Sequence, residues 1–229
     1  PARRWAVEHA SSDLTASSNL RAIQQLICAE PQRKALLLSQ RPPEADTSLQ
    51  LSRSYSDTYD PLLLKVKQAK DYFLLVGPPG TGKTSQALRF MIAEELEEQR
   101  QRERHGYDQQ AILITAYTNR AVDEICAMLS GEGWDYLRIS NPSSCAPQYS
   151  DHLLDSLFDL HADQLSLRQV SDYIRSNPII VGTTSMLQSR QEILELMSFS
   201  LCIVDEASQI LEPSIIGLLA HPSVGRFVL

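Results

Sequence analysis

Short apolar runs alternate with helix-patterned stretches along most of the chain from about residue 57 onward. The β-type runs lie at 72–76, 111–116, 136–139, 178–181, 201–204 and 226–229. Several of them are apolar throughout, which is typical of strands that are covered on both faces. Helical candidates lie at 85–104, 120–129, 165–176, 186–197 and 213–220. This alternation predicts an α/β fold with a parallel sheet flanked by helices.

The beginning of the chain follows a different pattern. Apolar residues recur at helical spacing between Leu20 and Ile27, and a polar, proline-broken link follows at 41–56. We therefore expect a helical appendage and linker over residues 1–56 and a single α/β domain over residues 57–229. Because the chain does not begin with methionine, we expect it to be a piece of a longer polypeptide.

Composition narrows the class of protein. Hydrophobic residues make up 43% of the chain and charged residues 21%, as in ordinary globular proteins. No apolar run approaches the roughly 18 residues that a membrane span needs, so no membrane partner is expected. The net charge of −7 argues against indiscriminate nucleic-acid binding, although a local basic channel is compatible with it. Four cysteines without a CxxC pair predict reduced thiols in a cytoplasmic protein.

One glycine-rich segment carries the clearest chemistry. Residues 77–84 read Gly-Pro-Pro-Gly-Thr-Gly-Lys-Thr, which fits the phosphate-binding pattern G-x-x-x-x-G-K-[ST], between an apolar run and a helical stretch. Glycines let backbone N–H groups turn inward around phosphates, and the helix start adds its positive dipole end. We expect Lys83 to reach the terminal phosphates and Thr84 to hold Mg²⁺. The predicted nucleotide-binding residues are Gly77, Pro78, Pro79, Gly80, Thr81, Gly82, Lys83, Thr84 and Ser85.

Two carboxylates follow another apolar run. Asp205 and Glu206 come directly after residues 201–204, at the carboxyl end of a predicted strand. A phosphate-binding loop needs an acidic partner on a neighbouring strand to complete its magnesium site. We expect Asp205 to contact Mg²⁺ through the water shell of the ion, and Glu206 to act as general base towards the attacking water. The chain carries no Asn/Thr-Lys-x-Asp motif for reading guanine, which disfavours a GTPase.

The residues around these motifs resemble a helicase family. Asp205-Glu206-Ala207-Ser208-Gln209 is similar to the Asp-Glu-Ala-x-Gln box of superfamily 1 helicases, in the branch that contains the nonsense-decay RNA helicase and the replication nuclease-helicase. The form of the glycine-rich loop is also usual in that branch. Residues 112–123, with the core Thr-Asn-x-Ala-Val-Asp, resemble the family's motif Ia, and 179–185 resemble a later motif that contacts nucleic acid.

This resemblance implies a P-loop NTPase with a RecA-like sheet, the first motor domain of an ATP-dependent helicase. It implies ATP and Mg²⁺ as cofactors, movement along single-stranded DNA or RNA, and a second RecA-like domain in the same polypeptide. Strand contacts would come from Thr118, Asn119, Thr183 and Thr184, and Gln209 would lie near the γ-phosphate. Free N–H groups at a helix start suit a phosphate, and ligands of open α/β sheets bind beyond the strand ends. The plainer alternatives are helix caps for the threonines and a buried amide for Gln209.

Two features depart from the family. Family members carry a glutamine upstream of the first glycine that reads the adenine edge, whereas Tyr59-Asp60 occupy that place here. The final apolar run, 226–229, resembles the strand that leads into the family's next motif. We expect that motif, and the second RecA-like domain with its arginine finger, to lie outside this chain. The arginine finger of the second domain is typically worth about 10³–10⁵ in rate. We therefore expect this chain alone to bind Mg-ATP and to hydrolyse it slowly.

Two other functions are compatible with the sequence. One is a P-loop ATPase that acts as a switch or remodels protein complexes, and the other is a catalytically idle nucleotide-binding module. Stimulation of the ATPase by nucleic acid would distinguish a helicase from the switch, and sensitivity to the loss of Glu206 would distinguish it from the idle module.

Overall fold

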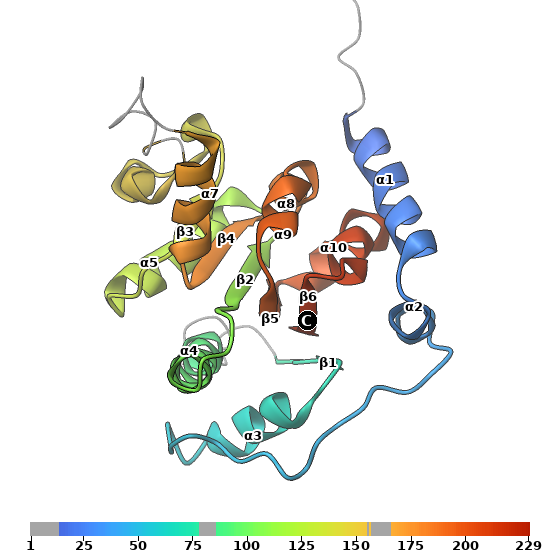
Figure 1. The fold of residues 1–229 in the computed structure, drawn as a ribbon, viewed down its shortest axis with the longest axis vertical. Helices are drawn as coiled ribbons and strands as arrows, with labels where there is room; N and C mark the ends of the chain where they lie inside the picture. Colours follow the sequence, from blue (N-terminus) through green and yellow to red (C-terminus); the bar gives the residue numbers. More distant parts are fainter. Residues whose placement is uncertain (1–13, 78–85, 155, 157–165) are drawn as a thin grey trace, which may run out of the picture.

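The structure, a computed structural model, describes residues 14–77, 86–154, 156 and 166–229. Within these ranges a six-stranded parallel sheet has the order β1-β6-β5-β2-β4-β3 (Figure 1). The strands are β1 (Tyr72–Phe73), β2 (Ala111–Ala116), β3 (Leu137–Ile139), β4 (Ile179–Thr183), β5 (Phe199–Asp205) and β6 (Val224–Val228). Each strand overlaps a run predicted from the sequence, so the parallel α/β prediction is confirmed.

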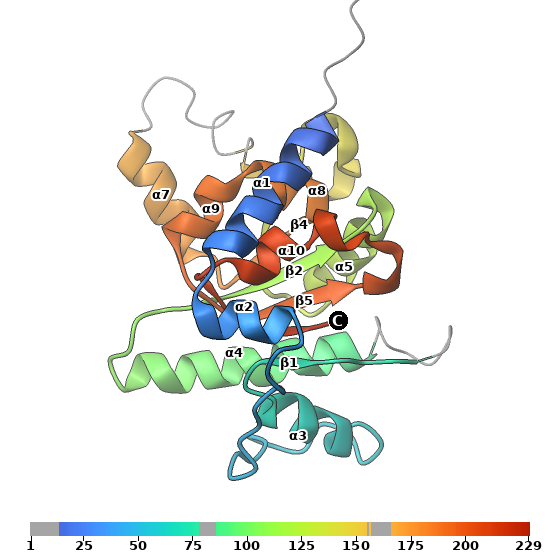
Figure 2. The same cartoon turned by 90° about the vertical axis from the view of Figure 1, so that its right-hand side faces the viewer.

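Helices cover both faces of this sheet (Figures 1 and 2). One face packs against α3 (Asp60–Gln68), α4 (Leu88–Arg104) and α5 (Asn119–Gly131). The other packs against α7 (Leu167–Ser176), α8 (Thr184–Ser189), α9 (Gln191–Leu196) and α10 (Ile216–Ala220). Short 3₁₀ turns are η2 (Pro142–Ser144), η3 (Pro147–His152), η4 (Ala207–Gln209) and η5 (Glu212–Ser214). None of the helices described here is long and apolar enough to cross a membrane.

The central strand β2 explains why its sequence is apolar throughout. All six of its residues are buried. Ile112 and Ile114 belong to the core on the α4 and α5 side, whereas Ala111 and Leu113 belong to the core on the α8 and α10 side. Because both faces of the strand are covered, Thr115 is the one polar residue in it, and its side chain is buried as well.

The predicted helix at 186–197 is two helices, because the chain breaks at Arg190 (φ −115, ψ 53). The Ser189 hydroxyl donates to the Met186 carbonyl at 2.8 Å, and such a bond competes with the helical ladder. The break lets Leu187 on α8 and Ile193 on α9 both pack against the sheet.

Helix α3 was not among the predicted helices. Asp60 and Pro61 at its start, and Lys65 and Lys67 in its last turn, are the usual signals for the two ends of a helix. The run of leucines between them was too short to show a clear helical period.

The N-terminal part of the described chain forms α1 (Leu14–Cys28) and α2 (Pro31–Leu37), as the appendage prediction expects. Both helices pack on α10. Arg33 donates to the carbonyl oxygen of Val224 at 2.6 Å, and Arg41 makes an ion pair with Asp71 at 2.7 Å. These contacts fasten the appendage to the α/β body, and the boundary at residue 56 stays a prediction.

Candidate functional site

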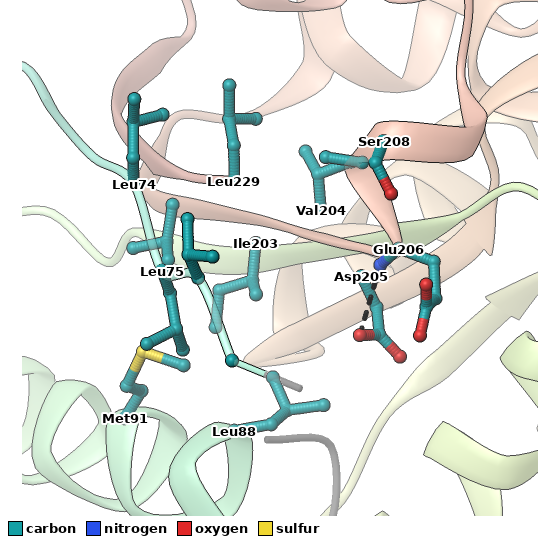
Figure 3. Close-up of a pocket in the computed structure, with 14 residues that line it drawn as sticks. Leu74, Leu75, Leu88, Met91, Ile203, Val204, Asp205, Glu206, Ser208 and Leu229 are labelled. Atoms are coloured by element: carbon teal, nitrogen blue, oxygen red, sulfur yellow. Dashed lines mark hydrogen bonds between the residues drawn. The ribbon is translucent and has the colours of Figure 1, made fainter. Parts of the chain in front are cut away.

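A cavity of about 370 Å³ opens at the carboxyl edge of the sheet, where β5 and β6 end and the chain leaves β1 (Figure 3). Its volume falls in the range of ligand sites, about 300–1,000 Å³. Apolar side chains such as Leu75 and Met91 form one side, and Asp205 and Glu206 lie on the other. Gly77, the first residue of the glycine-rich motif, lines the same cavity. The cavity therefore brings the start of that motif to the two predicted carboxylates.

Most of the glycine-rich motif lies outside the described residues. These positions are Pro78, Pro79, Gly80, Thr81, Gly82, Lys83, Thr84 and Ser85. Their roles in holding phosphates and Mg²⁺ therefore stay predictions. Leu88, the first residue of α4, lines the cavity as Gly77 does, so the residues described on both sides of the motif border one space.

The chain turns sharply where β5 ends. Asp205 is the last residue of the strand, and its Oδ1 accepts a hydrogen bond from the backbone N of Glu206 at 3.1 Å. Glu206 has the left-handed backbone conformation, with φ 53 and ψ 41, and its side chain is exposed. Gln209 at the end of η4 donates from Nε2 to Glu206 Oε2 at 3.3 Å. The exposed amide of Gln209 thus binds the carboxylate, which argues against the alternative of a buried amide.

The register of the central strands brings the other predicted residues to this edge. Ala116 at the end of β2 pairs with Thr183 on β4 and with Asp205 on β5. Thr118 follows two residues later and caps α5, with its hydroxyl accepting from Ala121 N at 3.2 Å. Thr118 and Asn119 are exposed, and Thr183 is partly exposed. The Thr183 hydroxyl likewise accepts from Met186 N at 3.2 Å and caps α8, so both threonines have the helix-cap role of the plainer alternative. Their side chains and that of Asn119 are still accessible at the edge that carries Asp205.

Thr184 differs from its neighbour Thr183. Its side chain is only 2% exposed, and its hydroxyl bonds to Thr115 and to the Ala116 carbonyl in the interior. Thr183 is the N-cap of α8 and Thr184 is its first helical residue. The backbone changes from extended to helical between them, so the Thr183 side chain faces the surface and the Thr184 side chain faces the interior. This position corrects the expectation that the Thr184 hydroxyl contacts nucleic acid directly.

The place of the family's adenine-reading glutamine has a structural role here. The ring of Tyr59 packs edge-on against Phe90, with 5.6 Å between centroids. The carboxylate of Asp60 accepts hydrogen bonds from the backbone N atoms of Tyr55 and Ser56 and so holds the turn that begins α3. Hydrogen bonding from Ser54, Ser56 and Tyr55 lowers the pKa of Asp60 below its ordinary value.

The donor set in the cavity suits a hard cation. Among the described residues no three His, Cys, Asp or Glu side chains gather closely enough to hold a metal by themselves. Asp205 borders the cavity with a carboxylate, the kind of oxygen ligand that Mg²⁺ combines with waters and substrate phosphates.

Comparison with known proteins agrees with this geometry. Residues 57–177, more than half of the chain, match the model of a family described as an AAA domain, and the chain belongs to that family. It is 30% identical over 204 residues to the mouse (Mus musculus) DNA replication ATP-dependent helicase/nuclease DNA2, covering 87% of this chain and 17% of that protein. It is 28% identical over 200 residues to JHS1, the helicase/nuclease of the same description from Arabidopsis thaliana, covering 86% and 14% respectively.

The chain thus spans less than a fifth of the length of these relatives. Among solved structures, the Hef helicase domain of Pyrococcus furiosus aligns over 62% of this chain and 23% of that one, with 14% identity and a TM-score of 0.38. The family match and the helicase/nuclease relatives confirm the resemblance to the RecA-like domain of superfamily 1 helicases. The roles of individual residues in the Asp-Glu-Ala-x-Gln box stay predictions.

Proposed function

We propose that this chain is the ATP-binding motor domain of an ATP-dependent superfamily 1 helicase, which couples Mg-ATP hydrolysis to movement along a single strand and to unwinding. The observation that carries the proposal is the register at Ala116, which pairs with Asp205 on one side and Thr183 on the other. The nucleotide carboxylates and the proposed strand contacts therefore share one sheet edge. Since the relatives are named as DNA replication proteins, we propose single-stranded DNA as the track, with RNA as the alternative.

Each residue has a chemical task in this proposal. Lys83 and the loop 77–85 bind the phosphates, and Thr84 and Asp205 hold Mg²⁺, which neutralises charge on the phosphates. Glu206 accepts a proton from the attacking water, and the amide of Gln209 keeps that carboxylate in place. Thr118, Asn119 and Thr183 bind phosphates of the strand.

Further parts of the protein belong to the proposal as well. A second RecA-like domain of the same polypeptide would close over the nucleotide and supply the arginine finger. The protein would work in the cytoplasm without a membrane partner. All four cysteines are free thiols, in keeping with a reducing compartment.

The test is steady-state ATP hydrolysis by the full-length protein, with and without single-stranded DNA or RNA. Lys83→Ala is the blank, and Lys65→Ala on α3, which does not line the cavity, is the matched control. We expect strong stimulation by DNA that disappears in Lys83→Ala and persists in Lys65→Ala. Stronger stimulation by RNA would assign the other track. A Lys83-dependent rate that ignores both polymers would refute the helicase and favour the protein-remodelling switch, which the net charge of −7 also fits.

A further inference from the structure

Two threonine hydroxyls form a hydrogen-bonded pair in the interior, just behind the carboxyl edge of the sheet. Thr115 on β2 is 0% exposed, and Thr184, the first residue of α8, is 2% exposed. Their Oγ1 atoms lie 3.2 Å apart, and Thr184 Oγ1 donates to the carbonyl oxygen of Ala116 at 3.3 Å. Because a hydroxyl has one proton, Thr115 must then donate to Thr184. The order of donation is therefore Thr115 to Thr184 to the Ala116 carbonyl.

This pair joins the segments that carry the proposed strand contacts. Thr115 lies three residues before Thr118, and Thr184 directly follows Thr183. The acceptor, Ala116, is the residue whose neighbours in the sheet are Thr183 and Asp205. The hydroxyl pair thus ties the end of β2 to the start of α8 at the point where the nucleotide and strand sites meet.

The other end of α8 is also fastened, in this case to the segment behind the carboxylates. Gln188 is 5% exposed and donates from Nε2 to the carbonyl oxygen of Pro213 in η5 at 3.4 Å. Leu187 packs closely over Gly182 of β4, where an added Cβ would come within 3.3 Å of its side chain. Helix α8 is therefore held by its first turn to β2 and by its last turn to the chain that follows Gln209.

On the basis of the proposed function, we propose that the Thr115–Thr184 pair is a positioning device for strand binding. It fixes the spacing between Thr118 and Thr183, so that both can meet phosphates of one bound strand. Two valines would fill a similar volume, but apolar contacts are not directional, whereas a satisfied buried hydrogen-bonded pair specifies one arrangement. Thr184 is then a positioning residue, and its neighbour Thr183 is the contact.

The experiment compares two substitutions at residue 184 in the full-length protein. Thr184→Val replaces the hydroxyl by a methyl group and leaves the Thr115 O–H without its acceptor, whereas Thr184→Ser keeps the hydroxyl. The affinity for a fluorescent single-stranded oligonucleotide is measured by anisotropy, and the KM for ATP by steady-state hydrolysis. We expect Thr184→Val to bind the strand roughly three- to tenfold more weakly, the loss of one buried hydrogen bond. The KM for ATP should change less, and Thr184→Ser should remain near wild type.

Two further variants separate positioning from general destabilisation. Ser200 lies at the opposite, amino end of β5, where its hydroxyl accepts from Gln99 and donates to the Ala111 carbonyl. Ser200→Ala removes both hydrogen bonds and should leave strand affinity unchanged. Thr115→Val leaves Thr184 its Ala116 acceptor, so it should cost less affinity than Thr184→Val. The double variant Thr115→Val/Thr184→Val should lose no more than Thr184→Val alone, because the two hydroxyls act as a unit.

Two results would overturn the inference alone. One is wild-type strand affinity in Thr184→Val, and the other is an equal loss of affinity in Thr184→Val and Ser200→Ala. If the wild-type protein neither binds the oligonucleotide nor responds to it, the proposed function fails, and this inference fails with it. The two failures are therefore distinguished by the wild-type protein.

Discussion

Glu206 joins an exposed carboxylate to a backbone conformation that few residues other than glycine adopt. Its φ of 53 and ψ of 41 lie in the left-handed region, which costs an L-residue about 1–2 kcal/mol. The hydrogen bonds to Asp205 Oδ1 and from Gln209 Nε2 hold it there. Backbone strain of this kind concentrates at functional sites, where the surrounding structure maintains it. The strain at Glu206 thus supports its proposed place beside the attacking water.

Two substitutions at Glu206 separate its chemistry from its strain. Glu206→Ala and Glu206→Gly should both lower nucleic-acid-stimulated ATP hydrolysis about 10²–10⁴-fold, because both remove the general base. The glycine variant should be more stable than the alanine variant by about 0.5–1 kcal/mol, since glycine adopts the left-handed conformation without strain. Urea unfolding and steady-state hydrolysis of the two variants measure these effects. Near-normal hydrolysis by Glu206→Ala would exclude Glu206 as the base.

At the scale of elements, a buried carboxylate on α4 anchors the segment before α3. Glu94 is 5% exposed and accepts hydrogen bonds from Ser52 N at 2.9 Å, from the Tyr55 hydroxyl at 2.8 Å and from Lys67 Nζ at 2.5 Å. Burial opposes its ionisation, but these hydrogen bonds outweigh burial and hold the pKa of Glu94 below its ordinary value. One ionised side chain therefore attaches both α3 and the preceding segment to α4.

The low pKa of Glu94 predicts a pH-dependent contribution to stability. A lowered folded-state pKa stabilises the fold above the ordinary pKa of a glutamate, and this contribution is lost as the pH falls through the folded-state value. Glu94→Gln should lower the free energy of unfolding by about 1–3 kcal/mol at pH 7, since it removes the 2.5 Å ion pair of Lys67 and leaves that ammonium group the longer 3.8 Å pair with Glu98. The difference from wild type should narrow below a pH of about 4.

Urea unfolding at pH 7 and at a series of pH values from about 4 down to about 3 measures this effect, with Glu97→Gln as the control. Glu97 lies on the same helix and makes only a partly exposed ion pair with Arg100 at 3.6 Å, so its loss should change little. Equal effects of the two substitutions would show that the Glu94 contacts do not stabilise the fold.

At the scale of the whole molecule, the N-terminal helices are built into the domain that lies far from them in sequence. Figure 2 shows α1 crossing in front of α10. The crossing is close because Gly217 has no side chain, and an added Cβ would lie 2.8 Å from Ala22 Cβ and 2.9 Å from Ala22 Cα. Since η5 and α10 follow the carboxylates in sequence, α1 packs on the chain that leaves the candidate site.

Glycine substitutions test whether this crossing stabilises the molecule. Gly217→Ala should lower the free energy of unfolding by about 1–3 kcal/mol, because the new methyl group meets the backbone of α1. It should also speed protease cleavage within residues 14–28. Gly131→Ala is the matched control, since a Cβ there meets nothing within 4 Å, and it should cause no loss. If Gly217→Ala has the same free energy of unfolding and the same cleavage rate as wild type, the close packing of α1 on α10 does not stabilise the molecule.

Particular residues show which elements and site residues can be predicted from the sequence and which cannot. The six strands were predictable because a buried parallel strand is a continuous apolar run, and the glycine-rich loop because its spacing is local. Asp205 and Glu206 were found because they end such a run. Helix α3 was missed although Asp60 and Pro61 marked its start, and the role of Thr115 was missed although it is the one polar residue in β2.

The fold class and the candidate chemistry follow from the amino-acid sequence, because both depend on patterns a few residues long. The three-dimensional structure was needed to show the strand order and the pairing of Ala116 with Thr183 and Asp205 at one edge. It was also needed to show that Thr184 is buried while its neighbour Thr183 is partly exposed. The packing of α1 on α10 is likewise visible only in the three-dimensional structure. These features depend on pairing between segments far apart in the chain, and a pattern of neighbouring residues does not specify which distant segment will cover them.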